Sequence, residues 1–164
     1  MDDIKIVPVS KDCYRDLSVM VGELLFEIMN TINQRVFDYD AQETEERAKE
    51  LIESGKYWVF IARIEGEDEP VGFISLYESY ALYAQGAYGT IPELYVKSGW
   101  RSKHIGNELL SKAIDFSVKK GWHRLEVTTP PLPEFDRTLN FYEKNGFVIS
   151  GGRKLKMDVM RPAP

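Results

Sequence analysis

The chain has 164 residues, 43% of them hydrophobic, and a formal net charge of −5 at pH 7. This length predicts a single domain over residues 1–164, large enough to bury a core without a disulfide or a metal. Cys13 is the only cysteine, which excludes an internal disulfide and a cysteine-based metal cluster and favours a reducing, cytoplasmic location. The acidic balance argues against nucleic acid as a partner, because affinity for phosphate backbones comes from clustered Lys and Arg.

Neither a secretory leader nor a membrane segment is expected. Residues 1–5 are acidic and no long apolar run follows them, unlike a signal peptide. No stretch approaches the ~20 apolar residues that cross a bilayer. An acidic surface attracts cationic small molecules, and amines are among them.

The first half of the chain predicts a strand, two helices and a hairpin. Apolar residues recur at helical spacing over residues 14–30, and a mostly charged second helix ends at Gly55. A Gly/Pro turn over residues 66–70 separates two stretches rich in aromatic and β-branched residues. The predicted elements are a strand at 4–8, helices at 14–30 and 41–54, and strands at 57–64 and 71–77.

The second half predicts four strands and two helices. One side of residues 102–120 is apolar, and Gly121 follows where a left-handed cap ends a helix. The predicted elements are strands at 90–96, 124–128, 147–149 and 154–159, and helices at 102–120 and 135–144. This order indicates a mixed α/β (α+β) fold with a largely antiparallel sheet.

The stretch from Glu93 to Leu110 combines a strand, a polar turn and the start of a helix. A helix N-terminus presents unpaired N–H groups and the positive end of its dipole, which can hold a phosphate. Arg101 and Lys103 add positive charge, and Gly106 would allow close approach of the backbone. From the residues alone, an anion site and a basic turn before an ordinary helix both stay open.

This stretch resembles the GNAT acetyltransferase superfamily. The family's pyrophosphate-binding motif (Arg or Gln, two residues, Gly, one residue, Gly or Ala) is matched by Arg-Ser-Lys-His-Ile-Gly at residues 101–106. Residues 141–147, Phe-Tyr-Glu-Lys-Asn-Gly-Phe, resemble the family's later block, and the resemblance covers residues 58–157. The chain departs from the pattern at His104, where the family has its first motif glycine, and at Phe135, where Asn is usual.

The resemblance implies a splayed central sheet flanked by helices and an enzyme that moves acetyl from acetyl-CoA to a primary amine by direct attack, without a metal. The acceptor would be a small-molecule or peptide amine, and a homodimer stays open because similar proteins are frequently dimers. The resemblance places the cofactor on the following residues: Leu94, Tyr95, Val96, Arg101, Ser102, Lys103, His104, Ile105, Gly106 and Asn107.

Direct transfer needs an unprotonated amine and a proton for the departing thiolate. A lysine-like amine has a pKa near ~10.4, so it arrives protonated at neutral pH and a base must accept its proton. Glu93 is the candidate base, and a surface carboxylate or a partner for a cation is the alternative. Tyr142 resembles the family's general acid, and a packed tyrosine with its hydroxyl bound to backbone is the alternative.

Two other functions stay open at this point. One is a non-catalytic acyl-CoA-binding sensor of the same fold, which the departures at His104 and Phe135 favour. The other is a partner-binding protein with a vestigial cofactor site, which would use exposed tyrosines. Four tyrosines fit either an acceptor pocket or packing across strands: Tyr77, Tyr80, Tyr83 and Tyr88. The residues do not distinguish a polyamine, an amino acid, an aminoglycoside or a peptide N-terminus as the acceptor.

Overall fold

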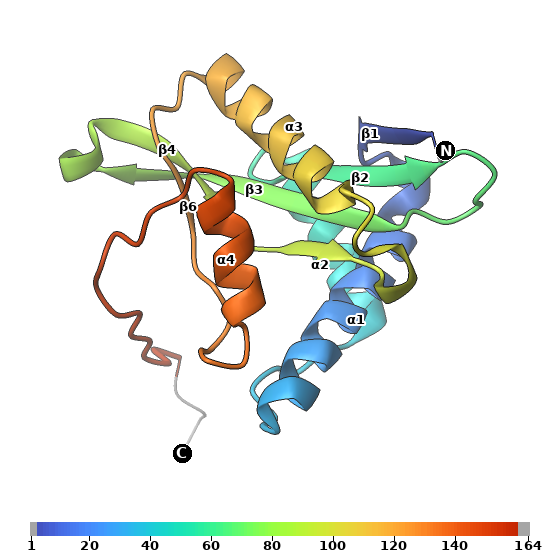
Figure 1. Cartoon of the computed structure of the whole chain (residues 1–164), viewed down its shortest axis with the longest axis horizontal. Helices are drawn as coiled ribbons and strands as arrows, with labels where there is room; N and C mark the ends of the chain where they lie inside the picture. The colour runs from blue at the N-terminus through green and yellow to red at the C-terminus, as the bar shows by residue number, and fades with distance from the viewer. Residues whose placement is uncertain (1–2, 161–164) are drawn as a thin grey trace.

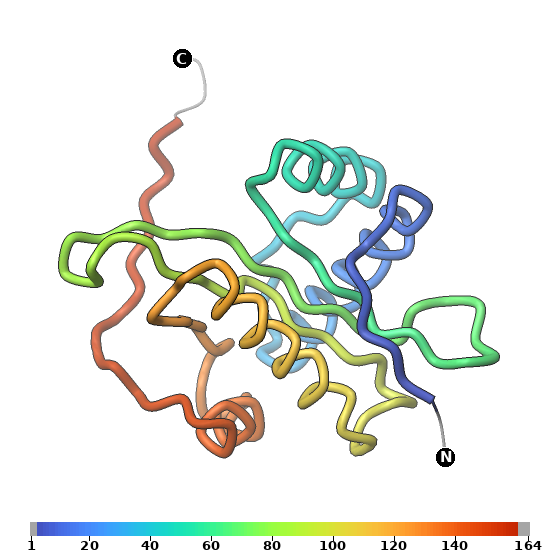
Figure 2. The backbone as a smooth tube through the Cα atoms, turned by 90° about the horizontal axis from the view of Figure 1, so that it is seen from above, coloured from blue at the N-terminus to red at the C-terminus, as the bar shows by residue number. Residues whose placement is uncertain are grey.

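The computed structural model of the chain describes residues 3–160; residues 1–2, part of the acidic N-terminus, and residues 161–164 lie outside it. In chain order the strands and α-helices are β1 (Ile4–Pro8), α1 (Tyr14–Ile32), α2 (Ala41–Glu53), β2 (Trp58–Ile64), β3 (Gly72–Ala81), β4 (Gly86–Ile91), β5 (Leu94–Val96), α3 (Ile105–Lys120), β6 (Leu125–Val127) and α4 (Asp136–Lys144). Helices α1 and α2 cover one face of the sheet, and α3 and α4 cover the other (Figures 1 and 2).

The six strands form one open sheet. Its order is β1-β2-β3-β4-β6, and β5 pairs with β3 beside β4. Every pairing is antiparallel except that of β4 with β6, which is parallel. This confirms the predicted mixed fold with a mostly antiparallel sheet. No helix within residues 3–160 is long and apolar enough to cross a membrane.

The single strand predicted over residues 90–96 is two strands separated by a β-bulge. Thr90 pairs with Tyr77 of β3, and Leu94 pairs with Ile74. Three residues lie between Thr90 and Leu94, whereas only two lie between their partners on β3. The segment that joins β4 to β5 therefore carries one extra residue. Pro92 lies inside the interruption, where it removes a backbone donor from the ladder. The prediction of one continuous strand is therefore wrong at its centre.

Helix α3 packs the apolar side predicted from its sequence against the sheet. Three of its side chains, Ile105, Leu109 and Leu110, are almost wholly buried in one cluster with Ile74 and Leu76 of β3. Burying a side chain of this size contributes about 1.5–3 kcal/mol. Gly121 ends the helix in the left-handed conformation, at φ 77°, as predicted. The start of α3 is therefore anchored firmly on the sheet.

Helix α1 packs on the opposite face of the same strands. Leu17 and Met20 of α1 belong to a second buried cluster that includes Ile61 of β2 and Phe73 of β3. Tyr95 of β5 belongs to this cluster, whereas its neighbours in β5 pack against the α3 cluster. Strand β5 is therefore held between the two cores by alternating side chains.

The two strands predicted at the C-terminus, residues 147–149 and 154–159, are absent from the described part of the chain. Both segments run as irregular chain after α4, and no strand of the sheet pairs with them. Gly146, Gly151 and Gly152 have positive φ values that interrupt extended backbone here. The prediction of these two strands is wrong, because neither segment has a ladder partner in the described sheet.

Candidate active site

The β-bulge before β5 fixes the candidate base, Glu93. Ser75 lies opposite it on β3 and is wholly buried. The Ser75 N–H donates to the carbonyl oxygen of Glu93 at 3.0 Å, and the Glu93 N–H donates to the Ser75 hydroxyl at 3.1 Å. The same hydroxyl donates to Oε1 of the Glu93 carboxylate. One serine therefore holds both the backbone and the side chain of the bulged residue.

A second hydroxyl reaches the same carboxylate oxygen. Tyr57, immediately before β2, donates from its hydroxyl to Oε1 of Glu93 at 2.7 Å. Its ring stacks on Tyr77, with ring centroids 6.2 Å apart. Burial and the nearby carboxylate raise the pKa of Tyr57 above its ordinary value, so the phenol stays protonated and donates.

The surroundings of Glu93 make its carboxylate a stronger proton acceptor than that of an exposed glutamate. Burial raises the pKa of Glu93, and this effect outweighs the lowering by the Ser75 and Tyr57 hydrogen bonds. Both hydroxyls donate to Oε1, and Oε2 has no donor within residues 3–160. Every buried side-chain oxygen in the described residues has a hydrogen-bond partner. Because Oε2 has none, it is not buried and reaches the surface. The carboxylate has hydroxyl donors rather than the cation of the alternative interpretation.

Strands β5 and β6 diverge next to Glu93. Strand β6 pairs with β4 as far as Ile91 and Val127, and β5 pairs only with β3. The edge of β5 that faces away from β3 therefore carries no ladder in the described sheet. The side chains of β5 pack into the two cores, so backbone groups remain on this edge to bind a ligand.

The turn before α3 uses two left-handed residues that are not glycine. Ser102 and His104 both have φ 65°, and His104 precedes the first residue of α3 without a side-chain cap. This conformation costs a residue other than glycine roughly 1–2 kcal/mol. His104 thus adopts the backbone shape that the motif glycine would supply, and the helix starts at Ile105 rather than at Ser102.

The first turn of α3 leaves backbone donors unused. The first bond of the helix runs from the Glu108 N–H to the His104 carbonyl at 3.0 Å. The N–H groups of Ile105, Gly106 and Asn107 make no hydrogen bond in the described structure. Together with the helix dipole they form a site suited to an anion. Ile105 offers only its backbone, because its side chain is buried.

Arg101 and Gly106 also make structural contacts. The Arg101 guanidinium donates to both carboxylate oxygens of Glu27 on α1, at 2.8 and 2.6 Å, and to the Val96 carbonyl at 2.9 Å. The charge of Arg101 is thus paired, and this ion pair holds the turn against α1. A Cβ added to Gly106 would lie 3.4 Å from the Phe141 ring, an ordinary van der Waals contact, so α4 would accept a small side chain at this position. The Lys103 ammonium lies 5.9 Å from the centroid of the Trp100 ring.

Tyr142 is buried in α4 with its hydroxyl uncommitted. The residue is only 5% exposed, and its ring packs edge-on against Phe141 and Phe147 at 5.3 Å between centroids. Burial raises the pKa of Tyr142, so the phenol is protonated at neutral pH. The Tyr142 hydroxyl makes no hydrogen bond to a described group. Because every buried side-chain oxygen in the described residues has a partner, this oxygen reaches the surface. This differs from the alternative in which the hydroxyl binds backbone.

Sequence comparison identifies the family of the chain. The pattern of the acetyltransferase (GNAT) family matches residues 23–147, about three quarters of the sequence. The chain belongs to the GNAT acetyltransferase family. No curated protein matches the sequence.

Solved structures share the GNAT fold at low sequence identity. An aminoglycoside acetyltransferase from an uncultured soil metagenomic sample is 19% identical, with a TM-score of 0.72 over 96% of this chain and 97% of the other. The aminoglycoside N-acetyltransferase AAC(6')-Iy, in complex with CoA, is 13% identical, with a TM-score of 0.78 over 98% and 97%. A transcriptional regulator from Bacillus halodurans is 24% identical, with a TM-score of 0.75 over 95% and 99%.

Sequence reasoning missed three residues around the GNAT motif. Ser75 and Tyr57 hold the Glu93 carboxylate, and Glu27 pairs with Arg101. Pro92 within a predicted strand was a signal for the bulge and hence for a partner across it. No signal pointed to Tyr57 or Glu27, because their contacts join segments far apart in the chain.

Three further residues of this GNAT chain, Cys13, Tyr39 and Asp40, have structural roles. Cys13 is buried and accepts a hydrogen bond from Arg63. Tyr39 donates to the Ser18 carbonyl at 2.7 Å, and Asp40 caps α2 by accepting from a backbone N–H. The described residues contain no group of three or more His, Cys, Asp or Glu side chains that could hold a metal.

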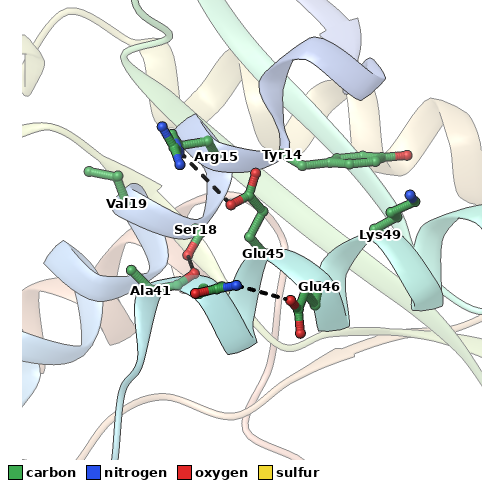
Figure 3. Close-up of a pocket in the computed structure, with 9 residues that line it drawn as sticks. Tyr14, Arg15, Ser18, Val19, Ala41, Glu45, Glu46 and Lys49 are labelled. Atoms are coloured by element: carbon green, nitrogen blue, oxygen red, sulfur yellow. Dashed lines mark hydrogen bonds and ion pairs between the residues drawn. The ribbon is translucent and has the colours of Figure 1, made fainter.

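Two cavities flank α2. The larger, of about 690 Å³, lies between α1 and α2 beside the Arg15–Glu45 ion pair, and none of the predicted site residues lines it (Figure 3). The smaller, of about 450 Å³, is lined by Tyr57, Tyr77 and Glu78 among others. Because the Tyr57 hydroxyl binds Glu93, the smaller cavity is connected to the candidate base through one side chain.

Proposed function

We propose that this GNAT protein is a cytoplasmic, acetyl-CoA-dependent N-acetyltransferase whose acceptor is a small-molecule or peptide primary amine. The observation that carries the proposal is the environment of Glu93. It combines a pKa raised by burial, one carboxylate oxygen fixed by two hydroxyls and one that reaches the surface. This carboxylate lies beside β5, whose outer edge pairs with no strand in the described sheet.

Acetyl-CoA would lie along the unpaired edge of β5 and the first turn of α3. The backbone of Leu94, Tyr95 and Val96 would bind its amide groups, and a backbone N–H would bind the developing oxyanion, a contribution of about 3–4 kcal/mol in other enzymes. The turn over residues 101–107 would bind the pyrophosphate. Its unpaired N–H groups and the helix dipole fit an anion, and Arg101 positions this turn through its contact with Glu27.

The reaction would proceed by direct attack. Glu93 accepts a proton from the ammonium, directly or through one water, and the freed nitrogen attacks the thioester carbonyl carbon. The carbon–sulfur bond breaks as Tyr142 donates its phenolic proton to the departing thiolate. The second proton of the attacking nitrogen passes through water to the Tyr142 phenolate, so that the products are the amide, the CoA thiol and the protonated Glu93. A raised pKa keeps Tyr142 protonated until that step. The acceptor would approach through the cavity beside Tyr57, whose hydroxyl already touches the base.

A second candidate is a non-catalytic acyl-CoA sensor of the same fold. The departures from the family pattern at His104, before α3, and at Phe135, before α4, favour it. Binding without transfer would distinguish this candidate from the enzyme.

The test measures thiol release from acetyl-CoA with a panel of polyamines, amino acids, aminoglycosides and peptides. The enzyme releases thiol with at least one amine class. Glu93→Gln and Tyr142→Phe each lower that rate at least tenfold while acetyl-CoA affinity, measured by isothermal titration, stays within about threefold of the wild type. Wild-type binding with no turnover for any amine would support the sensor, and unchanged rates in both variants would refute the assigned roles.

A further inference from the structure

A row of paired residues crosses three strands beside the candidate base, Glu93. The row consists of Tyr77 on β3, Thr90 on β4 and Glu126 on β6. Paired residues of neighbouring strands point to the same face of a sheet. The Tyr77 ring stacks on Tyr57, whose hydroxyl donates to the Glu93 carboxylate, so Glu93 lies on this face as well. Two carboxylates, those of Glu93 and Glu126, therefore share one face of the sheet.

The helices leave open the half of this face that β4 and β6 form. The residues that follow the row on these strands, Ile91 and Val127, belong to the α3 cluster on the opposite face. Within residues 3–160, the buried cluster beneath α1 includes no residue of β4 or β6. The hairpin of β3 and β4 extends beyond α1 and α2 (Figure 2). Tyr77 is 36% exposed and Glu126 is partly exposed, so a ligand can reach both ends of the row.

The row joins the proposed entrance of the acceptor to Glu126. Tyr77, at one end of the row, lines the cavity of about 450 Å³ beside Tyr57. Thr90 precedes Glu93 by three residues, which is about 10 Å of extended strand, and neighbouring strands lie about 5 Å apart. The backbones of Glu93 and Glu126 are therefore about 11 Å apart. A linear molecule with an ammonium at each end fits between two carboxylates at this spacing.

We propose that the acceptor is a linear diamine or polyamine whose reacting amine lies at Glu93 and whose second ammonium binds Glu126. This acceptor class rests on the proposed function, because it names the substrate of the same site. Alkylamines have a pKa near ~10.4, so such a molecule carries at least two positive charges at neutral pH. Glu93 removes a proton from one ammonium, and the Glu126 carboxylate holds the other. Glu126 thus determines specificity and takes no part in the chemical step.

A cation of the protein already lies beside Glu126. The Arg124 guanidinium donates to Oε2 of Glu126 at 3.2 Å, and the two side chains are 42% and 40% exposed. Ion pairs that are this exposed are weak, so the ammonium of a ligand can compete with Arg124. Within residues 3–160, Oε1 of Glu126 accepts no hydrogen bond and remains for the ligand. Because Arg124 repels a dication, its removal favours a diamine.

The first test compares putrescine with butylamine, which has the same carbon chain but only one amine. The readout is the ratio of the two kcat/KM values, putrescine over butylamine, measured by thiol release from acetyl-CoA. The ratio is above about ten in the wild type, about three- to tenfold lower in Glu126→Gln, and higher than wild type in Arg124→Gln. The control, Glu67→Gln, removes the same charge from the turn between β2 and β3 and leaves the ratio unchanged. A merely structural role of Glu126 would change both rates alike.

The second test separates the charge of the acceptor from its polarity. In 4-aminobutanol a hydroxyl replaces the second ammonium of putrescine, and this compound reacts like butylamine. A kcat/KM equal to that of putrescine, or an unchanged ratio in Glu126→Gln, would overturn the assignment of Glu126. Acetylation of other amines, with putrescine no better than butylamine, would overturn the acceptor class alone. No thiol release with any amine would overturn the proposed function and the acceptor class with it.

Discussion

Replacing Tyr57 by Phe removes one of the two hydroxyls that stabilise the charged form of Glu93. The hydroxyl donates to Oε1 at 2.7 Å and lowers the pKa of Glu93 against the larger raising effect of burial. Hydrogen bonds to charged groups contribute about 1.5–3 kcal/mol. A free-energy difference of about 1.36 kcal/mol between the charged and neutral forms changes the pKa of a group by one unit. Because Oε2 reaches the surface and Ser75 still donates to Oε1, we take the lower end of that range.

In Tyr57→Phe the proton on Glu93 is therefore held more tightly. The base is active when deprotonated, so activity rises with pH through its pKa, and the acid limb of kcat/KM moves upward by about one pH unit. The control is Tyr77→Phe, which keeps the ring that stacks on Tyr57 and removes a hydroxyl that does not contact Glu93. An acid limb that stays in place or moves to lower pH in Tyr57→Phe would show that the Tyr57 hydroxyl does not stabilise the charged form of Glu93.

Three further predictions concern stability in urea unfolding. His104→Gly stabilises the chain by about 1 kcal/mol, because the residue has φ 65°; a loss of stability would contradict this. Leu110→Ala costs about 2–5 kcal/mol, because its side chain is fully buried in the α3 cluster, and a cost under 1 kcal/mol would count against that packing. Gly22→Ala destabilises by about 1–3 kcal/mol, because a Cβ would lie 2.6 Å from the Tyr39 ring; Gly55→Ala, where nothing lies within 4 Å, tests backbone strain alone.

The sequence predicted the helices well because their signals are local. Apolar spacing located α1 and α3, and Gly121 marked the end of α3 in the conformation expected of it. The start of α3 was placed three residues early, because Ser102 and His104 adopt left-handed backbone that residue type does not announce.

Strand pairing was predicted less well because it depends on distant partners. Pro92 marks a place where the ladder is interrupted, but the extra residue of the bulge follows from the registers of two ladders on β3. The terminal segment has the alternation of a strand, but alternation does not supply the edge on which a strand forms.

In the candidate site too, the sequence predicted residues by their position in a motif but not their contacts with distant segments. The family resemblance pointed to Glu93 and Tyr142 by position, and the structure adds the environment that sequence could not give. Tyr57 and Ser75 reach Glu93 across 36 and 18 residues of chain. Arg101 was expected to contribute charge to the cofactor, and its pairing with Glu27 depends on where α1 packs.

The most direct test of the proposed function follows the acetyl group itself. Wild-type protein is incubated with acetyl-CoA labelled with carbon-13 at the carbonyl and with the amine that gives the highest thiol release, and the product is examined by NMR. A labelled amide carbonyl forms with the wild type, and it forms at least tenfold more slowly with Glu93→Gln. Thiol release without a labelled amide, or equal amide formation by both proteins, would contradict it.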